Sequence, residues 1–194
     1  IDDVLWVANE EFSEDMQKMG GTEALDEPYI ETPIFKLFKK RVVWLIILFF
    51  GELMTITAMQ GYEDEIAKVV ILATFIPLII SSGGNSGSQA STLIIQAMAL
   101  GEITIADWWR IMRRELISGL LLGTSLCLLA FSVIAVWHFF TDTFGGHAAL
   151  IGLTVGCSLI GIVIWGTLMG SMLPLILKKF GADPAASSTP FVAT

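Results

Sequence analysis

The sequence predicts an all-α fold, a polytopic helical membrane protein with four full spans, the start of a fifth and an N-terminal amphipathic helix. Hydrophobic residues make up 54% of the chain and charged residues only 15%, whereas soluble domains carry about 25% charged residues. Charges are missing from three long runs, at 69–101, 116–141 and 143–177. Because a helix needs about 20 apolar residues to cross a bilayer, each run is long enough for a span.

The N-terminal region, residues 1–41, differs from the rest of the chain in charge. Its first 35 residues hold ten carboxylates against one lysine, Lys18, whereas the rest of the chain is nearly balanced, so the net negative charge of the chain lies in this region. Apolar residues recur at steps of three and four as far as Met19, which is typical of an amphipathic helix. Gly20-Gly21, Pro28 and Pro33 then indicate a break and a linker. We therefore expect a water-exposed arm with its linker over 1–41 and a membrane domain over 42–194.

The membrane domain divides into spans in a regular order. We expect the first span over 42–60, the second over 66–100, the third over 115–137 and the fourth over 148–177. Residues 101–114 are expected to form a loop or a surface helix. Residues 185–194 have the character of a fifth span that stops at Thr194, so we expect the native chain to continue.

Basic residues collect on one side of the predicted membrane. They are Lys36, Lys39, Lys40, Arg41, Arg110, Arg113, Arg114, Lys178 and Lys179. The turns on the other side carry Glu63, Asp64, Glu65 and Asp142. Because cytoplasmic loops are enriched in Lys and Arg, this pattern predicts a cytoplasmic arm. No basic stripe lies outside these loops, so we expect no nucleic-acid partner.

The centre of the second span is unusually polar. Residues 81–89 read Ser-Ser-Gly-Gly-Asn-Ser-Gly-Ser-Gln. We expect the helix to unwind here, because unpaired carbonyls near Gly83, Gly84 and the Asn85 amide are suitable ligands for a hydrated cation inside a membrane. The alternative is that the glycines only permit close helix packing.

Glu52 lies near the middle of the first span. A carboxylate at that depth is costly and indicates a functional group by default. The alternative is a structural glutamate that is protonated or hydrogen-bonded to another helix.

Glu14 and Asp15 on the arm, and Asp183 in the turn after the fourth span, form a third candidate site. If the arm docks under the membrane domain, these carboxylates converge. Magnesium prefers oxygen ligands and commonly uses one or two carboxylates together with water. The alternative is a solvated acidic surface.

Several of these segments resemble the MgtE family of magnesium channels. The resemblance lies in the long motif from Pro77 to Ile94, in Gly181-Ala-Asp-Pro-Ala185, and in Pro190-Phe-Val-Ala-Thr194. The arm around Ser13-Glu14-Asp15-Met16 resembles the plug helix of that family.

This resemblance implies a homodimer in the plasma membrane, with the ion path between second and fifth spans at the subunit interface. It implies that further cytoplasmic domains precede the arm and that the principal pore carboxylate lies beyond Thr194. It also implies that cytoplasmic Mg²⁺ closes the gate by bridging Glu14, Asp15 and Asp183, and that the backbone near Ala193 lies close to the pore ion.

The leading functional hypothesis is therefore a Mg²⁺-selective channel that cytoplasmic Mg²⁺ gates through the arm, with Mg²⁺ as transported and regulatory ion. A proton- or sodium-coupled divalent cation transporter that uses Glu52 is the alternative. A module that assembles without conducting ions is a further alternative. We expect no enzyme, because no nucleophile is paired with a base at similar membrane depth.

Overall fold

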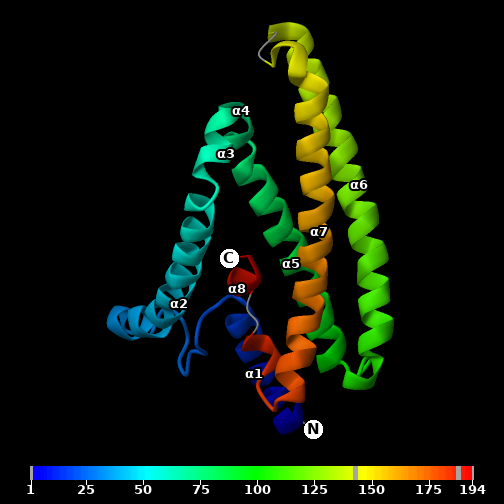
Figure 1. The fold of residues 1–194 in the computed structure, drawn as a ribbon. Helices are drawn as coiled ribbons and strands as arrows, with labels where there is room; N and C mark the ends of the chain where they lie inside the picture. The colour runs from blue at the N-terminus through cyan, green and yellow to red at the C-terminus, as the bar shows by residue number, and fades with distance from the viewer. Residues whose placement is uncertain (1, 142–143, 187–188, 194) are drawn as a thin grey trace.

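The computed structural model describes residues 2–141, 144–186 and 189–193, and every regular element in these ranges is a helix (Figure 1). Four helical segments are long and apolar enough to cross a membrane, at Ile34–Gln60, Val70–Ala99, Ile105–Thr141 and Ala148–Lys179. The prediction of a polytopic helical membrane protein is therefore confirmed.

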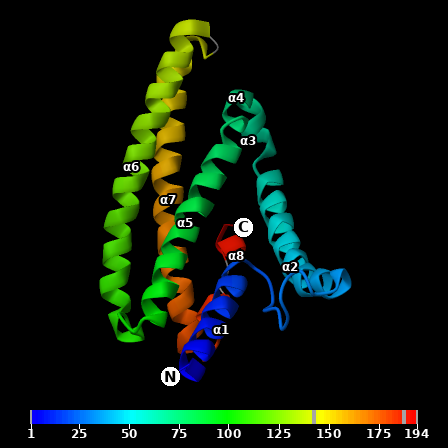
Figure 2. The ribbon, with the colours of Figure 1, turned by 180° about the vertical axis from the view of Figure 1, so that it is seen from behind.

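Three helices form the packed body of the molecule. They are α5 (Ile76–Ala99), α6 (Trp108–Thr141) and α7 (Ala148–Lys179). Helices α6 and α7 run side by side, while α5 packs on the C-terminal half of α7 and diverges from it toward its own N-terminus (Figures 1 and 2). Val155, Leu159 and Val163 of α7 are buried between the helices. The body is thus centred on α7.

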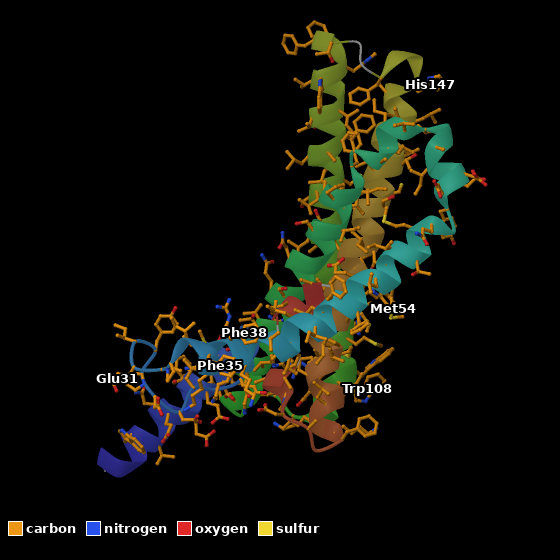
Figure 3. The ribbon with its side chains drawn as sticks, turned by 90° about the vertical axis from the view of Figure 1, so that its left-hand side faces the viewer. Glu31, Phe35, Phe38, Met54, Trp108 and His147 are labelled. Atoms are coloured by element: carbon orange, nitrogen blue, oxygen red, sulfur yellow. The ribbon has the colours of Figure 1, made fainter. Side chains whose placement is uncertain are left out.

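Helix α2 (Ile34–Gln60) stands apart from this body. None of the residues in its membrane-length window is buried. Its side chains, including Phe35, Phe38 and Met54, are open to the surroundings (Figure 3). An apolar helix of which no residue in the window is buried is suited to lipid or to a further protein surface.

The arm forms α1 (Asp2–Met19), which lies at the end of the body where α7 terminates (Figures 1 and 2). The predicted break at Gly20-Gly21 is confirmed. Gly21 has a φ of 73°, and the amide N–H groups of Gly21 and Thr22 donate to the carbonyls of Lys18 and Gln17. This is the Schellman motif that commonly ends helices.

Two of the membrane-length helices begin earlier in the sequence than predicted. Helix α2 begins at Ile34 and not at residue 42, directly after Pro33, whose ring is favourable at the start of a helix. Helix α6 begins at Trp108, after a short 3-10 turn, Ile105–Asp107, that Thr104 and Asp107 cap reciprocally. The basic residues 36–41 and 110–114 are therefore helical.

The predicted unwinding of residues 81–89 is wrong, because α5 is helical throughout Ile76–Ala99. The interruption lies earlier, between α3 (Glu63–Lys68), α4 (Val70–Ala73) and the start of α5 next to Pro77. A continuous helix satisfies its own backbone groups, which lipid cannot do. Close contact with α7 compensates for the helix-weakening effect of the glycines.

After α7 the chain turns at Gly181 and forms two short helices. They are η3 (Pro184–Ala186) and α8 (Thr189–Ala193), and α8 packs against α5. Thr194 and residues 187–188 lie outside the described residues. The expected start of a fifth span thus corresponds to α8.

Candidate functional site

The first candidate site joins the arm to the turn after α7. Helix α1 presents Glu14, Asp15 and Lys18 toward that turn. Lys18 Nζ lies 2.7 Å from Glu14 Oε1 and 2.7 Å from Asp183 Oδ2. The convergence of Glu14 and Asp15 with Asp183 is therefore present, but an ammonium group lies between Glu14 and Asp183.

The turn holds Asp183 in a fixed orientation. Asp183 Oδ1 accepts a hydrogen bond from the backbone N–H of Ala185 at 2.9 Å. Ala185 itself is buried against the body. This local bond, common for Asp in turns, leaves Oδ2 directed at the arm.

Asp15 lines a cavity of about 190 Å³ together with Asp183 and Lys178, and α5 closes one side of it. Burial raises the pKa of Asp15, and the nearby carboxylate of Asp183 raises this pKa further. Glu11 and Glu14 act in the same direction, whereas Lys18 lowers it. Because the neighbouring carboxylates repel the negative charge of Asp15, its carboxyl group binds a cation or a proton more readily.

This donor set fits a hydrated divalent cation better than a stripped one. In the described part of the chain, no three His, Cys, Asp or Glu side chains are close enough to enclose a metal ion. The cavity has room for several waters. Magnesium keeps several of its waters and needs only one or two carboxylates, so Asp15 and Asp183 suit it.

The second candidate site lies where α5 crosses α7 and α8. A Cβ atom on Gly83 would lie 2.6 Å from Ile162 Cγ1, and one on Gly84 would lie 3.0 Å from the Cα of Ala193. The carbonyl of Gly83 also abuts Gly166. The structure therefore brings Gly83, Gly84 and Ala193 together, as small residues that allow close packing. The backbone around them remains helical.

Asn85 lies on another face of the same helix. It is exposed, and its Nδ2 lies 3.4 Å from Ser81 Oγ, one turn earlier. Gln89 and Gln96 are exposed on the same side, since residues at steps of three and four share a helix face. We call Ser81, Asn85, Gln89 and Gln96 the polar stripe of α5. The 3.6-residue period of these side chains is a signal that our sequence-based interpretation missed.

Glu52 is exposed on α2, and its side chain forms no hydrogen bond or ion pair with any residue that the structure describes. The structure therefore does not bring it to either of the two sites above.

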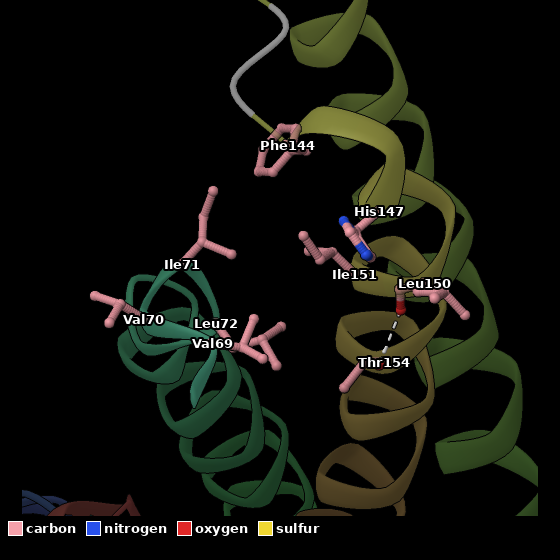
Figure 4. A pocket seen from close by; sticks show the side chains of 9 residues that line it. All are labelled: Val69, Val70, Ile71, Leu72, Phe144, His147, Leu150, Ile151 and Thr154. Atoms are coloured by element: carbon pink, nitrogen blue, oxygen red, sulfur yellow. Dashed lines mark hydrogen bonds between the residues drawn. The ribbon is translucent and has the colours of Figure 1, made fainter. Parts of the chain in front are cut away.

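A larger cavity, about 520 Å³, lies at the opposite end from the arm (Figure 4). Its walls are mainly Val69, Ile71 and Leu72 on one side and Phe144 and Ile151 on the other. Such walls offer few oxygen ligands, so this cavity is unsuited to a hard divalent cation.

Sequence reasoning also missed Lys18 as a member of the arm site. Glu14 and Lys18 are four residues apart with the glutamate first, the favourable order for an ion pair on a helix. The ion pair between Glu14 and Lys18 was therefore predictable from the sequence. The ion pair between Lys18 and Asp183 was not, because it depends on how the arm docks.

Comparison with known proteins agrees with this architecture. The model of the MgtE family, described as a divalent cation transporter, matches residues 76–194. Magnesium transporter MgtE of Thermus thermophilus is 39% identical over the whole chain, which covers 41% of that protein. The proteins of the same name from Enterococcus faecalis and Bacillus subtilis are each 29% identical over the whole chain, covering 40% and 41% of their lengths.

The chain thus spans about two fifths of the length of the curated relatives that it matches. The family match includes α5 with its glycine-rich crossing, helices α6 and α7, and the turn that holds Asp183. The chain belongs to the MgtE family of divalent cation transporters.

Proposed function

We propose that this chain is the membrane part, with its gating arm, of a Mg²⁺-selective channel. The observation that carries the proposal is the polar stripe of α5, which lies open on a helix of membrane length. Lipid is a poor partner for side-chain amides, so this stripe needs water or protein beside it. The names of the relatives, magnesium transporters, favour an aqueous ion path.

The stripe suits a hydrated ion. Asn85 and Gln89 offer amide oxygens that accept hydrogen bonds from the waters around a cation. Because magnesium dehydrates reluctantly, a path lined by neutral acceptors favours an ion that keeps its water shell. Gly84 allows Ala193 to approach α5 beside this stripe.

A homodimer explains which surface covers the stripe. Helix α2 and the outer face of α5 are uncovered in one chain. A second copy that faces them through a two-fold axis would enclose the stripe as a pore at the subunit interface. It would also shield Glu52 from lipid.

The arm site provides the gate in this proposal. Asp15 and Asp183 repel each other when both are charged, and this repulsion favours release of the arm. A dication that neutralises Asp15, Asp183 and Glu14 favours docking. The starts of α2 and α6 and the end of α7, which carry the basic residues, lie at the same end of the molecule as the arm (Figure 1). By the positive-inside rule this end is cytoplasmic in the plasma membrane.

Mg²⁺ flux through the full-length protein in liposomes tests conduction. Asn85→Leu should slow Mg²⁺ entry severalfold. Thr124→Val should not, because Thr124 is exposed on α6 and bonds only to its own helix at Leu120. Equal flux in the two variants would remove the polar stripe from the ion path.

Protection of the arm from protease, with Mg²⁺ titrated in, tests the gate. Wild type should become protected as Mg²⁺ rises. Asp183→Asn should need more Mg²⁺, and Glu10→Gln, exposed on the same helix as Glu14, should behave as wild type. Protection that ignores Mg²⁺ would contradict the gate. Asp183→Asn should also weaken the inhibition of current by internal Mg²⁺ in patch recordings.

A proton- or sodium-coupled transporter remains the second candidate, because Glu52 is an exposed carboxylate on a helix of membrane length. Voltage-driven Mg²⁺ current without a proton or sodium gradient distinguishes the two. A channel carries this current, whereas a strictly coupled transporter does not and should lose coupling in Glu52→Gln.

A further inference from the structure

The contact between the arm and the body contains a positive charge that the proposed gate does not use. Lys18 belongs to α1 and Asp183 to the turn after α7, and the two lie 165 residues apart in sequence. Their 2.7 Å ion pair connects the arm directly to the body. The same ammonium group holds Glu14 at 2.7 Å.

Both oxygens of Asp183 have partners in this arrangement. Oδ1 accepts from the Ala185 N–H, and Oδ2 accepts from Lys18 Nζ. The hydrogen bonds to Asp183 and Glu14 raise the pKa of Lys18, so the ammonium stays charged throughout the physiological range. A cation that bridges Glu14 and Asp183 would have to occupy the place of this ammonium.

The contact is also accessible to ions from solution. The Lys18 side chain is 30% exposed and those of Glu14 and Asp183 are each 40% exposed. Partly exposed ion pairs exchange with water and are weak enough to be displaced.

We propose that Lys18 is a built-in counter-ion that latches the arm to the Asp183 turn, and that a divalent cation must displace it to bridge Glu14 and Asp183. The displacement step rests on the proposed gate, whereas the latch does not. The arm therefore stays partly docked at low Mg²⁺, and the lysine limits how far Mg²⁺ can change the docked fraction.

The docked fraction is measurable as a distance between spin labels on the arm and on the body of the full-length protein. Glu10→Cys and Phe180→Cys provide exposed attachment sites, with Cys127 and Cys157 replaced by alanine. The samples contain either a chelator or saturating Mg²⁺. The variants are Lys18→Gln, Lys18→Arg as the charge-retaining form, and Lys39→Gln as a matched control. Lys39 is exposed on α2 and forms no ion pair in the described chain.

In chelator, Lys18→Gln should lower the ratio of docked to released arm by up to about fivefold, as expected for the loss of one partly exposed ion pair between the arm and the body. Lys18→Arg and Lys39→Gln should match wild type. Saturating Mg²⁺ should restore docking in Lys18→Gln, so this variant should respond more to Mg²⁺ than wild type does.

Equal docking of Lys18→Gln and Lys39→Gln in chelator would overturn the latch. If instead Lys18→Gln releases the arm in chelator and Mg²⁺ changes docking in no variant, the latch stands and the displacement step is overturned together with the gate. The two failures are thus distinguishable.

Discussion

Helices α5 and α7 pack so closely that one methyl group is expected to separate them. The carbonyl of Gly87 lies against Gly170, at the place where a Cβ atom would project. Gly161 is on the same helix, two to three turns earlier, and a Cβ atom there has no neighbour within 4 Å. Gly170→Ala and Gly161→Ala therefore add the same atom to the same helix in opposite environments.

The expected magnitudes follow from two opposing effects. Alanine stabilises a helix by about 1 kcal/mol relative to glycine, and this gain applies to both variants. Overpacking a tight contact costs about 1–3 kcal/mol. At Gly170 the obstacle is a backbone carbonyl, which cannot rotate away, so the upper part of this range applies. We expect Gly170→Ala to lose about 2 kcal/mol and Gly161→Ala to gain up to about 1 kcal/mol.

Reversible unfolding of the full-length protein in mixed micelles measures this difference as a free energy of unfolding. A secondary readout is Mg²⁺ flux, which should fall in Gly170→Ala if separation of α5 from α7 disturbs the polar stripe. Equal free energies of unfolding in the two variants would refute the reasoning, because they would mean that the α5–α7 contact tolerates a methyl group.

Three further predictions concern the arm and the linker. Asp15→Asn should increase docking in chelator, because it removes a half-buried charge that faces Asp183; spin-label distances check this. Docking raises the pKa of Asp15, so the docked arm binds a proton more readily than the released arm. Docking should therefore strengthen as the pH falls from neutral toward the ordinary pKa of an aspartate, and Asp15→Asn should lose this part of the pH dependence. Asp26→Asn should speed protease cleavage of the linker, because Asp26 binds Lys36 and Lys40 at the start of α2; Glu31→Gln, an exposed linker residue, is the control.

The spans were predictable because their signal is local. A charge-free run of sufficient length indicates a segment that avoids water, and α5, α6 and α7 coincide closely with such runs. Helix ends such as Gly21 and Gly181 were predictable for the same reason, since both adopt the positive φ that glycine favours.

The role of the glycines in α5 was not predictable from their own segment. Glycine is compatible both with an unwound backbone and with a helix in close contact with another helix. Which of the two forms depends on the segment that packs against the glycine. That partner is Gly166 and Gly170 on α7, about 80 residues later, at the same four-residue spacing as Gly83 and Gly87. A search for matching small-residue spacings on different spans would have favoured packing.

The arm site was predictable in composition but not in arrangement. Asp183 was recognisable as a candidate ligand, and its Asx-type bond to Ala185 is local. Whether Lys18 or a cation faces Asp183 depends on the rotation of α1 about its own axis. The apolar residues of α1 do not fix that rotation, because Trp6, Phe12 and Met16 are exposed in the structure.

The contrast between these two contacts bears on how the protein can switch. The α5–α7 contact is made by backbone atoms at van der Waals distance, so it has one arrangement and resists change. The arm is held to the Asp183 turn by a partly exposed ion pair with Lys18, which is worth about 1 kcal/mol or less. A ligand switches an element between two states only if it binds one state more tightly than the other. The difference in binding free energy must exceed the free-energy difference between the two states, so the latter has to be no more than a few kcal/mol. The polar contact meets this condition and the glycine contact does not. Regulation by an ion is therefore expected at the arm, with α5, α6 and α7 acting as the rigid frame against which the arm moves.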